Sequence, residues 1–229
     1  MLLLFDIDGT LLGRATRAHS QALYAALAEV HGVDLQQLSG VVSPAGRTDG
    51  EIARLLLLEA GVSARRIDER ADAVRESCCR AYARLCPPDL SEFVLPGIPD
   101  LLAWLAGQPA VRLSLLTGNY EPVARLKLAR AGVGRWFASG QGAFGSDSED
   151  RTMLPAIARR RAGTPSRPWP RADTLVIGDT PRDIACARAD GVRCAAVATG
   201  PHSPEELAEA DIVVADALGL RGALESLLN

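Results

Sequence analysis

Short apolar runs recur along this chain, and each is flanked by glycine, aspartate or threonine. They lie at residues 2–5, 111–116, 174–178, 193–197 and 211–214. Runs of this length are typical of strands that are buried on both faces of a parallel sheet. Helix patterns lie between them, at residues 99–107, 121–132, 151–163, 181–191 and 204–210. This alternation predicts an α/β fold with a doubly wound, Rossmann-like parallel sheet.

One block interrupts the alternation. From about residue 14 to residue 88 the sequence has helix patterns and no strand pattern; one apolar stripe comprises Ile67, Ala71, Val74, Cys78, Ala81 and Leu85. A second helix is predicted from Thr48, because Glu51 completes a capping-box pattern. Ligands of open α/β sheets bind at the carboxyl ends of strands, so an insert after the first strand would cover the binding site. We therefore expect a core domain of residues 1–13 and 89–229 and a helical cap domain of residues 14–88.

The net charge and the composition indicate which kinds of binding partner and cellular location to expect. The net charge of −3 gives no sign of a basic surface for a nucleic-acid backbone. The five cysteines lack C-x-x-C spacing, as expected of reduced thiols in a cytosolic protein. The opening apolar run is too short for a signal peptide, and no run approaches the roughly 20 residues that cross a bilayer. We expect a cytoplasmic protein without nucleic-acid or membrane partners, and the oligomeric state stays open.

Polar residues follow three of the predicted strands. Together with the glycines between them, they are Asp6, Asp8, Thr117, Gly118, Asn119, Gly178, Asp179, Thr180 and Asp183. The side chains of Asp6 and Asp8 would point to the same side of an extended strand. Carboxylates gathered at one sheet edge repel one another, and their oxygens are the ligands that Mg²⁺ prefers. Each motif alone also fits a plain turn or a helix cap, but three at successive strand ends favour catalysis.

Three motifs together resemble a known superfamily. F-D-I-D-G-T-L at 5–11, L-T-G-N at 116–119 and I-G-D-T-P-R-D at 177–183 are similar to motifs one, two and four of the haloacid dehalogenase superfamily of phosphohydrolases. The helical block resembles that superfamily's first-type cap, so the likeness spans the whole chain. G-R-T-D at 46–49 and L-P-G-I at 95–98 are similar to the branch with phosphoglycolate phosphatase and β-phosphoglucomutase.

The resemblance implies roles for the acidic residues. Asp6 would attack phosphorus and form an aspartyl-phosphate. Asp8 would protonate the leaving alcohol and later deprotonate water. Mg²⁺ would be held by Asp6, the backbone carbonyl of Asp8 and Asp179, with Asp183 in support.

The resemblance also implies a phosphate grip. Thr117 and the amides around Gly118 and Asn119 would bind the phosphoryl oxygens. In the cap, Arg47 is a candidate for the far end of the substrate, although the helix cap at Thr48 explains part of the same motif.

The third motif departs from the superfamily, which carries a lysine ahead of a helix. Here the residue in that place is Arg151, which keeps the positive charge and is able to donate two hydrogen bonds to phosphate oxygens. The only lysine of the chain, Lys127, falls within a predicted helix after the second motif, and we expect it on a solvated face.

These residues predict a Mg²⁺-dependent phosphatase that acts on a small phosphorylated metabolite such as phosphoglycolate or a sugar phosphate. Two alternatives stay open: a β-phosphoglucomutase-like phosphomutase, and a catalytically inactive protein that binds a phosphorylated ligand. Dehalogenase activity is disfavoured because Asp8 would serve no purpose in it. Phosphonatase activity is disfavoured because it requires a cap lysine, and residues 14–88 contain none.

Overall fold

The computed structural model describes residues 1–13, 17–34 and 42–228. Its strands form one six-stranded sheet in the order β3-β2-β1-β4-β5-β6, and every neighbouring pair is parallel. The strands are β1 (Leu2–Phe5), β2 (Arg112–Thr117), β3 (Ala143–Phe144), β4 (Thr174–Gly178), β5 (Arg193–Val197) and β6 (Ile212–Val214). The first strand thus lies at the centre, and the chain extends the sheet to both sides of it. This confirms the predicted doubly wound α/β fold.

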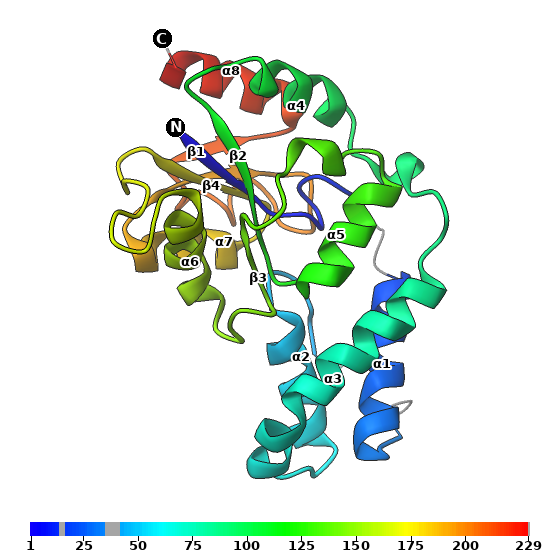
Figure 1. Ribbon diagram of the computed structural model, residues 1–229. Coiled ribbons are helices and arrows are strands. Elements are labelled where there is room, and N and C mark those ends of the chain that lie inside the picture. The colour runs from blue at the N-terminus through cyan, green and yellow to red at the C-terminus, as the bar shows by residue number, and fades with distance from the viewer. Residues whose placement is uncertain (14–16, 35–41, 229) are drawn as a thin grey trace.

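Helices cover both faces of the sheet (Figure 1). Leu3 and Phe5 of β1 pack in one core, together with α4 (Ile98–Ala106), α5 (Glu121–Arg130) and α8 (Ala217–Leu228). Leu2 and Leu4 pack in a second core with α6 (Leu154–Ala162) and α7 (Pro181–Asp190). Because alternate residues of a strand point to opposite faces, this apolar strand is fully buried. Its carboxyl end is therefore held in a fixed position.

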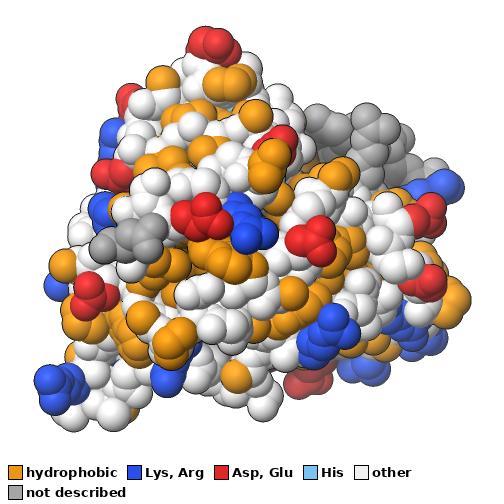
Figure 2. Space-filling view, turned by 90° about the horizontal axis from the view of Figure 1, so that it is seen from above, with side chains coloured by type: hydrophobic (Ala, Val, Ile, Leu, Met, Phe, Trp, Pro, Cys, Tyr) orange, Lys and Arg blue, Asp and Glu red, His pale blue; other side chains and the backbone are white. Residues whose placement is uncertain are grey.

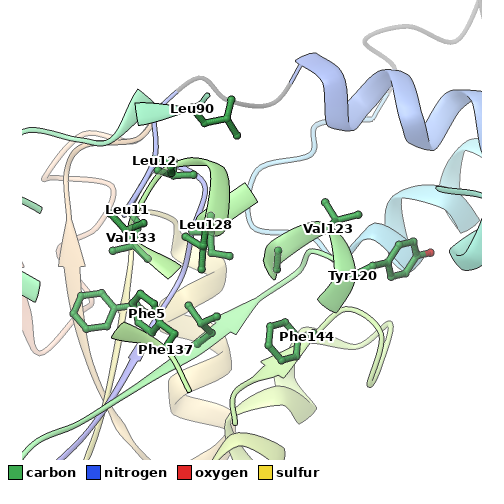
Figure 3. Close-up of a cluster of buried hydrophobic side chains, with 14 of the residues drawn as sticks. Phe5, Leu11, Leu12, Leu90, Tyr120, Val123, Leu128, Val133, Phe137 and Phe144 are labelled. Carbon is green, nitrogen blue, oxygen red and sulfur yellow. The ribbon is translucent and has the colours of Figure 1, made fainter. Parts of the chain in front are cut away.

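Figure 3 shows part of the first core. The ring of Phe5 packs edge-on against that of Phe137, with 6.1 Å between the ring centroids. Val123 and Leu128 of α5 belong to the same cluster. One face of α5 is thus buried against the sheet.

Three α-helices lie between β1 and α4 in the described residues, followed by a short 3₁₀ helix, η2 (Ser91–Phe93). The three α-helices are α1 (Arg17–His31), α2 (Asp49–Glu59) and α3 (Ala64–Leu85), and they lie at the end of the sheet where β1 and β2 finish (Figure 1). The predicted cap of α2 is confirmed, since the Oγ1 of Thr48 accepts a hydrogen bond from the amide of Glu51 at 3.1 Å. On α3 most of the predicted stripe is buried, but Tyr82 is buried in place of the exposed Leu85. The domain boundaries at residues 13 and 89 stay a prediction.

Several predicted elements differ from the structure. Residues 204–210 form turns and a bend instead of the predicted helix, because seven residues are too few to propagate a helix without support from packing. The predicted helix at 151–163 begins as a short 3₁₀ turn, η4 (Arg151–Met153), and continues as α6. The two-residue strand β3 and helix α8 were not predicted.

The face that carries α4 and α8 mixes acidic and basic side chains with apolar ones, in keeping with the small net charge (Figure 2). Within the described ranges, the helices are all too short or too polar to cross a bilayer.

Candidate active site

Three buried carboxylates meet at the carboxyl edge of the sheet. Asp6 follows β1, Asp179 follows β4, and Asp183 lies in the first turn of α7. One oxygen of each lies within 4.8 Å of the others. The structure thus brings together three of the four predicted metal-binding residues through their side chains.

Strand pairing explains this convergence. β1 and β4 are parallel neighbours with Phe5 opposite Ile177, so the residues after both strands emerge side by side. The amide of Asp6 also donates to the carbonyl of Ile177 at 2.9 Å. Gly9 then turns the chain with a φ of +87°, and a Cβ there would lie 2.1 Å from Oδ2 of Asp179. Glycine is therefore required at position 9, both for its backbone conformation and for the room that Asp179 occupies.

Electrostatics within the cluster are unfavourable. Burial raises the pKa of Asp6 to about 6, against the lowering effect of Arg151. Burial, reinforced by the neighbouring charges of Asp6 and Asp183, raises the pKa of Asp179 to about 8. A divalent cation would remove this repulsion, and carboxylate oxygens are ligands that suit Mg²⁺. The residues present therefore fit the predicted metal.

Arg151 lies against these carboxylates, at the start of η4. Its Nη2 is 2.6 Å from Oδ1 of Asp183 and 3.1 Å from Oδ2 of Asp6. The other oxygen of Asp183 accepts from the amide and the hydroxyl of Thr180, at 2.9 and 2.7 Å. Within the described residues, the buried Nε of Arg151 has no hydrogen-bond partner. The structure thus places a positively charged donor where the sequence predicts the cation of motif three.

Asp8 lies beside Lys127, whose predicted position was wrong. The side chain of Lys127 is 0% exposed, and its Nζ is 2.8 Å from both carboxylate oxygens of Asp8 and from Oδ1 of Asn119. Burial by itself would raise the pKa of Asp8, but Lys127 holds it below its ordinary value. The helix period indicates this buried position, since Lys127 follows the buried Val123 and Ala124 by four and three residues and so lies on the same face of α5.

The predicted phosphate grip lies at the end of β2. Thr117 is completely buried, and its Oγ1 accepts from the amide of Asn119 at 3.4 Å. The Nδ2 of Asn119 donates to Oδ2 of Asp8 at 3.0 Å. A Cβ at Gly118 would lie 2.0 Å from the carbonyl oxygen of Arg47, so the segment before α2 passes directly over this turn.

Asp49 fastens α2 to that turn, a role that the sequence patterns did not reveal. Its amide donates to the carbonyl of Gly118 at 2.8 Å, and its Oδ2 accepts from the amide of Tyr120 at 2.7 Å. The same oxygen is 3.0 Å from Nε2 of His19 on α1. The beginning of α2 is thereby joined to the carboxyl edge of the sheet by two hydrogen bonds.

A second set of contacts joins α2 and its N-cap to Glu149, which lies in the loop before η4. The hydroxyl of Thr48 donates to the carbonyl of Glu149 at 2.7 Å, and Arg54 pairs with the Glu149 carboxylate. The helices after β1 are therefore tied to two separate loops of the sheet.

Arg47 is engaged within its own segment. Its Nε donates to the carbonyl of Ser43 at 3.1 Å, and its Nη1 pairs with Glu51. A role at the far end of the substrate stays a prediction for this residue.

Comparison with known proteins agrees with this arrangement. Residues 3–188 match the haloacid dehalogenase-like hydrolase family. Phosphoglycolate phosphatase 1 of Pseudomonas aeruginosa is 30% identical, over 91% of this chain and 73% of that protein. The crystal structure of a predicted phosphatase from Clostridium acetobutylicum superposes with a TM-score of 0.68 at 18% identity, over 98% of each chain. That of a predicted phosphoglycolate phosphatase from Haemophilus somnus has a TM-score of 0.67 at 18% identity, over 97% of each chain. These two structures share the fold, and the family match spans most of the sequence.

The match includes the strand ends that carry Asp6, Thr117 and Asp179. The chain therefore belongs to the haloacid dehalogenase-like hydrolase family, as its motifs predict, and is a hydrolase.

Proposed function

We propose that this hydrolase is a Mg²⁺-dependent phosphatase for a small phosphorylated metabolite, and that it works through an aspartyl-phosphate on Asp6. The observation that carries this proposal is the buried cluster of Asp6, Asp179, Asp183 and Arg151 at the carboxyl edge of the sheet. The curated relative named phosphoglycolate phosphatase makes phosphoglycolate the first substrate to test.

In this proposal the carboxylate of Asp6 attacks phosphorus and displaces the alcohol. The Nε of Arg151 has no hydrogen-bond partner in the described part of the chain. Together with Thr117 and the amides of Gly118 and Asn119, it supplies donors for the phosphoryl oxygens. Lys127 favours the ionised form of Asp8 in the free protein, so Asp8 must take up a proton from solvent before it protonates the leaving oxygen. The resulting carboxylate then takes a proton from the water that hydrolyses the intermediate.

The metal would be held by Asp6, Asp179 and the backbone carbonyl of Asp8. Asp183 supports it by orienting Arg151, because both of its oxygens already accept hydrogen bonds. Four carboxylates face two cationic side chains here, Lys127 and Arg151, so negative charge is in excess before substrate enters. When bound, Mg²⁺ supplies positive charge that lets a carboxylate and an anionic ester approach each other.

We further propose that residues 14–88 act as a cap over a core of residues 1–13 and 89–229. The contacts of Asp49 with Gly118 and Tyr120 support this division of roles, because they hold helix α2 against the end of β2. A cap in this position would exclude water and contact the leaving group, with Arg47 as a candidate contact. A cytoplasmic location belongs to the same proposal.

The test is a measurement of phosphate release by the purified protein, with Mg²⁺ and with EDTA. The substrates are p-nitrophenyl phosphate, phosphoglycolate and a panel of sugar phosphates. We expect release only with Mg²⁺, and we expect Asp6→Asn to abolish it. Asp72→Asn, on the exposed side of α3, is the matched control and keeps full activity.

Three results would contradict the proposal. Normal turnover by Asp6→Asn would show that Asp6 is not the nucleophile. Conversion of β-glucose 1-phosphate into glucose 6-phosphate in place of hydrolysis would show a mutase. Binding of phosphate esters without any Mg²⁺-dependent release would show an inactive binding protein.

A further inference from the structure

The only lysine of the chain, Lys127, is buried and contacts both oxygens of one carboxylate. The Nζ of Lys127 lies 2.8 Å from Oδ1 and Oδ2 of Asp8, and also 2.8 Å from Oδ1 of Asn119. Asn119 in turn donates to Oδ2 of Asp8 at 3.0 Å. Both oxygens of Asp8 are thus held in place by donors from β2's end and from α5.

Packing does not require a lysine at this position. Its neighbours on the inner face of α5 are the apolar Val123, Ala124 and Leu128, two of which are labelled in Figure 3. An ammonium group in such surroundings is costly unless it is paired, and an apolar side chain of similar length would fill the same space. The lysine is therefore explained by the groups that it contacts.

The two buried cations of the site have separate contacts. Arg151 contacts Asp6 and Asp183, and its buried Nε has no hydrogen-bond partner among the described residues, so it is able to donate to a substrate oxygen. Lys127 has three N–H donors and three oxygens at 2.8 Å, which leaves it no donor for substrate. Lys127 thus acts on Asp8 and not on the phosphoryl group.

We propose that Lys127 is a positioning residue that fixes the orientation of the Asp8 carboxylate, with Asn119 as the second support. This inference rests on the proposed function, because it concerns the group assigned to proton transfer. Misplacement of a reacting group by about 1 Å can cost roughly 10²-fold in rate. Loss of Lys127 would therefore lower kcat while substrate binding by Arg151 and the end of β2 continues.

The test is a double-mutant cycle with p-nitrophenyl phosphate and Mg²⁺. We expect Lys127→Met to lower kcat by roughly 10²-fold with little change in KM. In the Asp8→Asn background the same substitution should change kcat by a factor of about 1, because Lys127 acts through Asp8. Arg125→Met is the matched control on the same helix, since Arg125 binds the carbonyls of Phe137 and Gln141; it should keep kcat.

The contrary results are specific. Unchanged kcat in Lys127→Met, or a loss that multiplies with that of Asp8→Asn, overturns the proposal. Thermal unfolding shows whether each variant is folded, and Lys127→Gln replaces Lys127→Met if the latter is not. Unfolding of both would show a purely structural role and likewise overturn the proposal. Failure of the proposed function is separate, because it appears as an inactive wild type or an active Asp6→Asn.

Discussion

The carboxylate of Asp49 accepts a hydrogen bond from the backbone amide of Tyr120 at 2.7 Å, and this bond joins helix α2 to the loop that follows β2. The two residues are distant in sequence, and both are buried. The end of β2 is thereby connected to the segment that lies over it. The same oxygen of Asp49 lies 3.0 Å from Nε2 of His19, so three elements share one acceptor.

Asp49→Ala should destabilise the fold. It leaves the buried amide of Tyr120 without its acceptor, and an unsatisfied buried donor costs about 1–3 kcal/mol. Urea unfolding measures the loss, with Asp72→Ala as the control, because the side chain of Asp72 is 81% exposed and pairs with Arg75 on the surface of the same helix. The control should change stability by no more than about 0.5 kcal/mol. Equal effects of the two substitutions would contradict a role for the Asp49 contact.

Gly118→Ala should impair substrate turnover. The added Cβ would lie 2.0 Å from the carbonyl oxygen of Arg47, so the segment before α2 must move away from β2. We expect a higher KM and a lower kcat in the phosphatase assay. At Gly222 on α8, an added Cβ would have no described neighbour within 4 Å. Gly222→Ala should therefore stabilise the protein by about 0.4–1 kcal/mol without an effect on kinetics. Normal kinetics in Gly118→Ala would show that the close contact is unimportant for turnover.

Arg151→Met should lower kcat by roughly 10²–10³-fold, the loss that follows removal of a donor to a developing oxyanion. Arg159 offers a matched control, because it forms a buried pair with Asp190 at 2.6 Å outside the site. Arg159→Met should reduce stability, because it leaves the buried Asp190 carboxylate with the more exposed Arg171, at 3.2 Å, as its cationic partner. It should keep kcat at temperatures where it is folded. Similar losses of kcat in the two variants would mean that Arg151 is only structural.

Asp179→Asn should stabilise the metal-free protein, and increasingly so at higher pH. The pKa of Asp179 is raised by burial and by its acidic neighbours from 3.8 to about 8, so the folded chain holds a proton that the unfolded chain has lost. Stability conferred by this group is therefore present at low pH and is lost as pH rises from about 4 to about 8. Asparagine lacks this dependence.

Thermal unfolding in EDTA across this pH range measures the difference between Asp179→Asn and the wild type. Saturating Mg²⁺ should reverse the order, because only the wild type gains binding energy. A difference that stays constant with pH, or an order that Mg²⁺ does not reverse, would contradict the electrostatic description of the cluster.

Most of the fold and several site residues follow from sequence patterns. β1, β4 and β5 have the predicted bounds because each is an apolar run with clear flanks. β3 was not predicted because two residues carry no period. Asp6, Asp179 and Asp183 were predicted to converge because the carboxyl ends of parallel strands share one edge.

The missed features depend on contacts between distant segments. The charge of Lys127 predicts a surface position, whereas its place on the apolar stripe of α5 and its pairing with Asp8 keep it buried. The bond between Asp49 and Tyr120 has no sequence signal, because neither residue stands in a periodic or motif relation to the other.

Calorimetric titration of Mg²⁺ into the metal-free protein most directly tests whether the buried carboxylates of Asp6 and Asp179 hold a divalent ion together. The wild type should bind the ion, and Asp179→Asn, although folded and more stable without metal, should show no binding under the same conditions. Equal affinity of the two proteins for Mg²⁺, or no binding by the wild type, would contradict the metal-dependent mechanism.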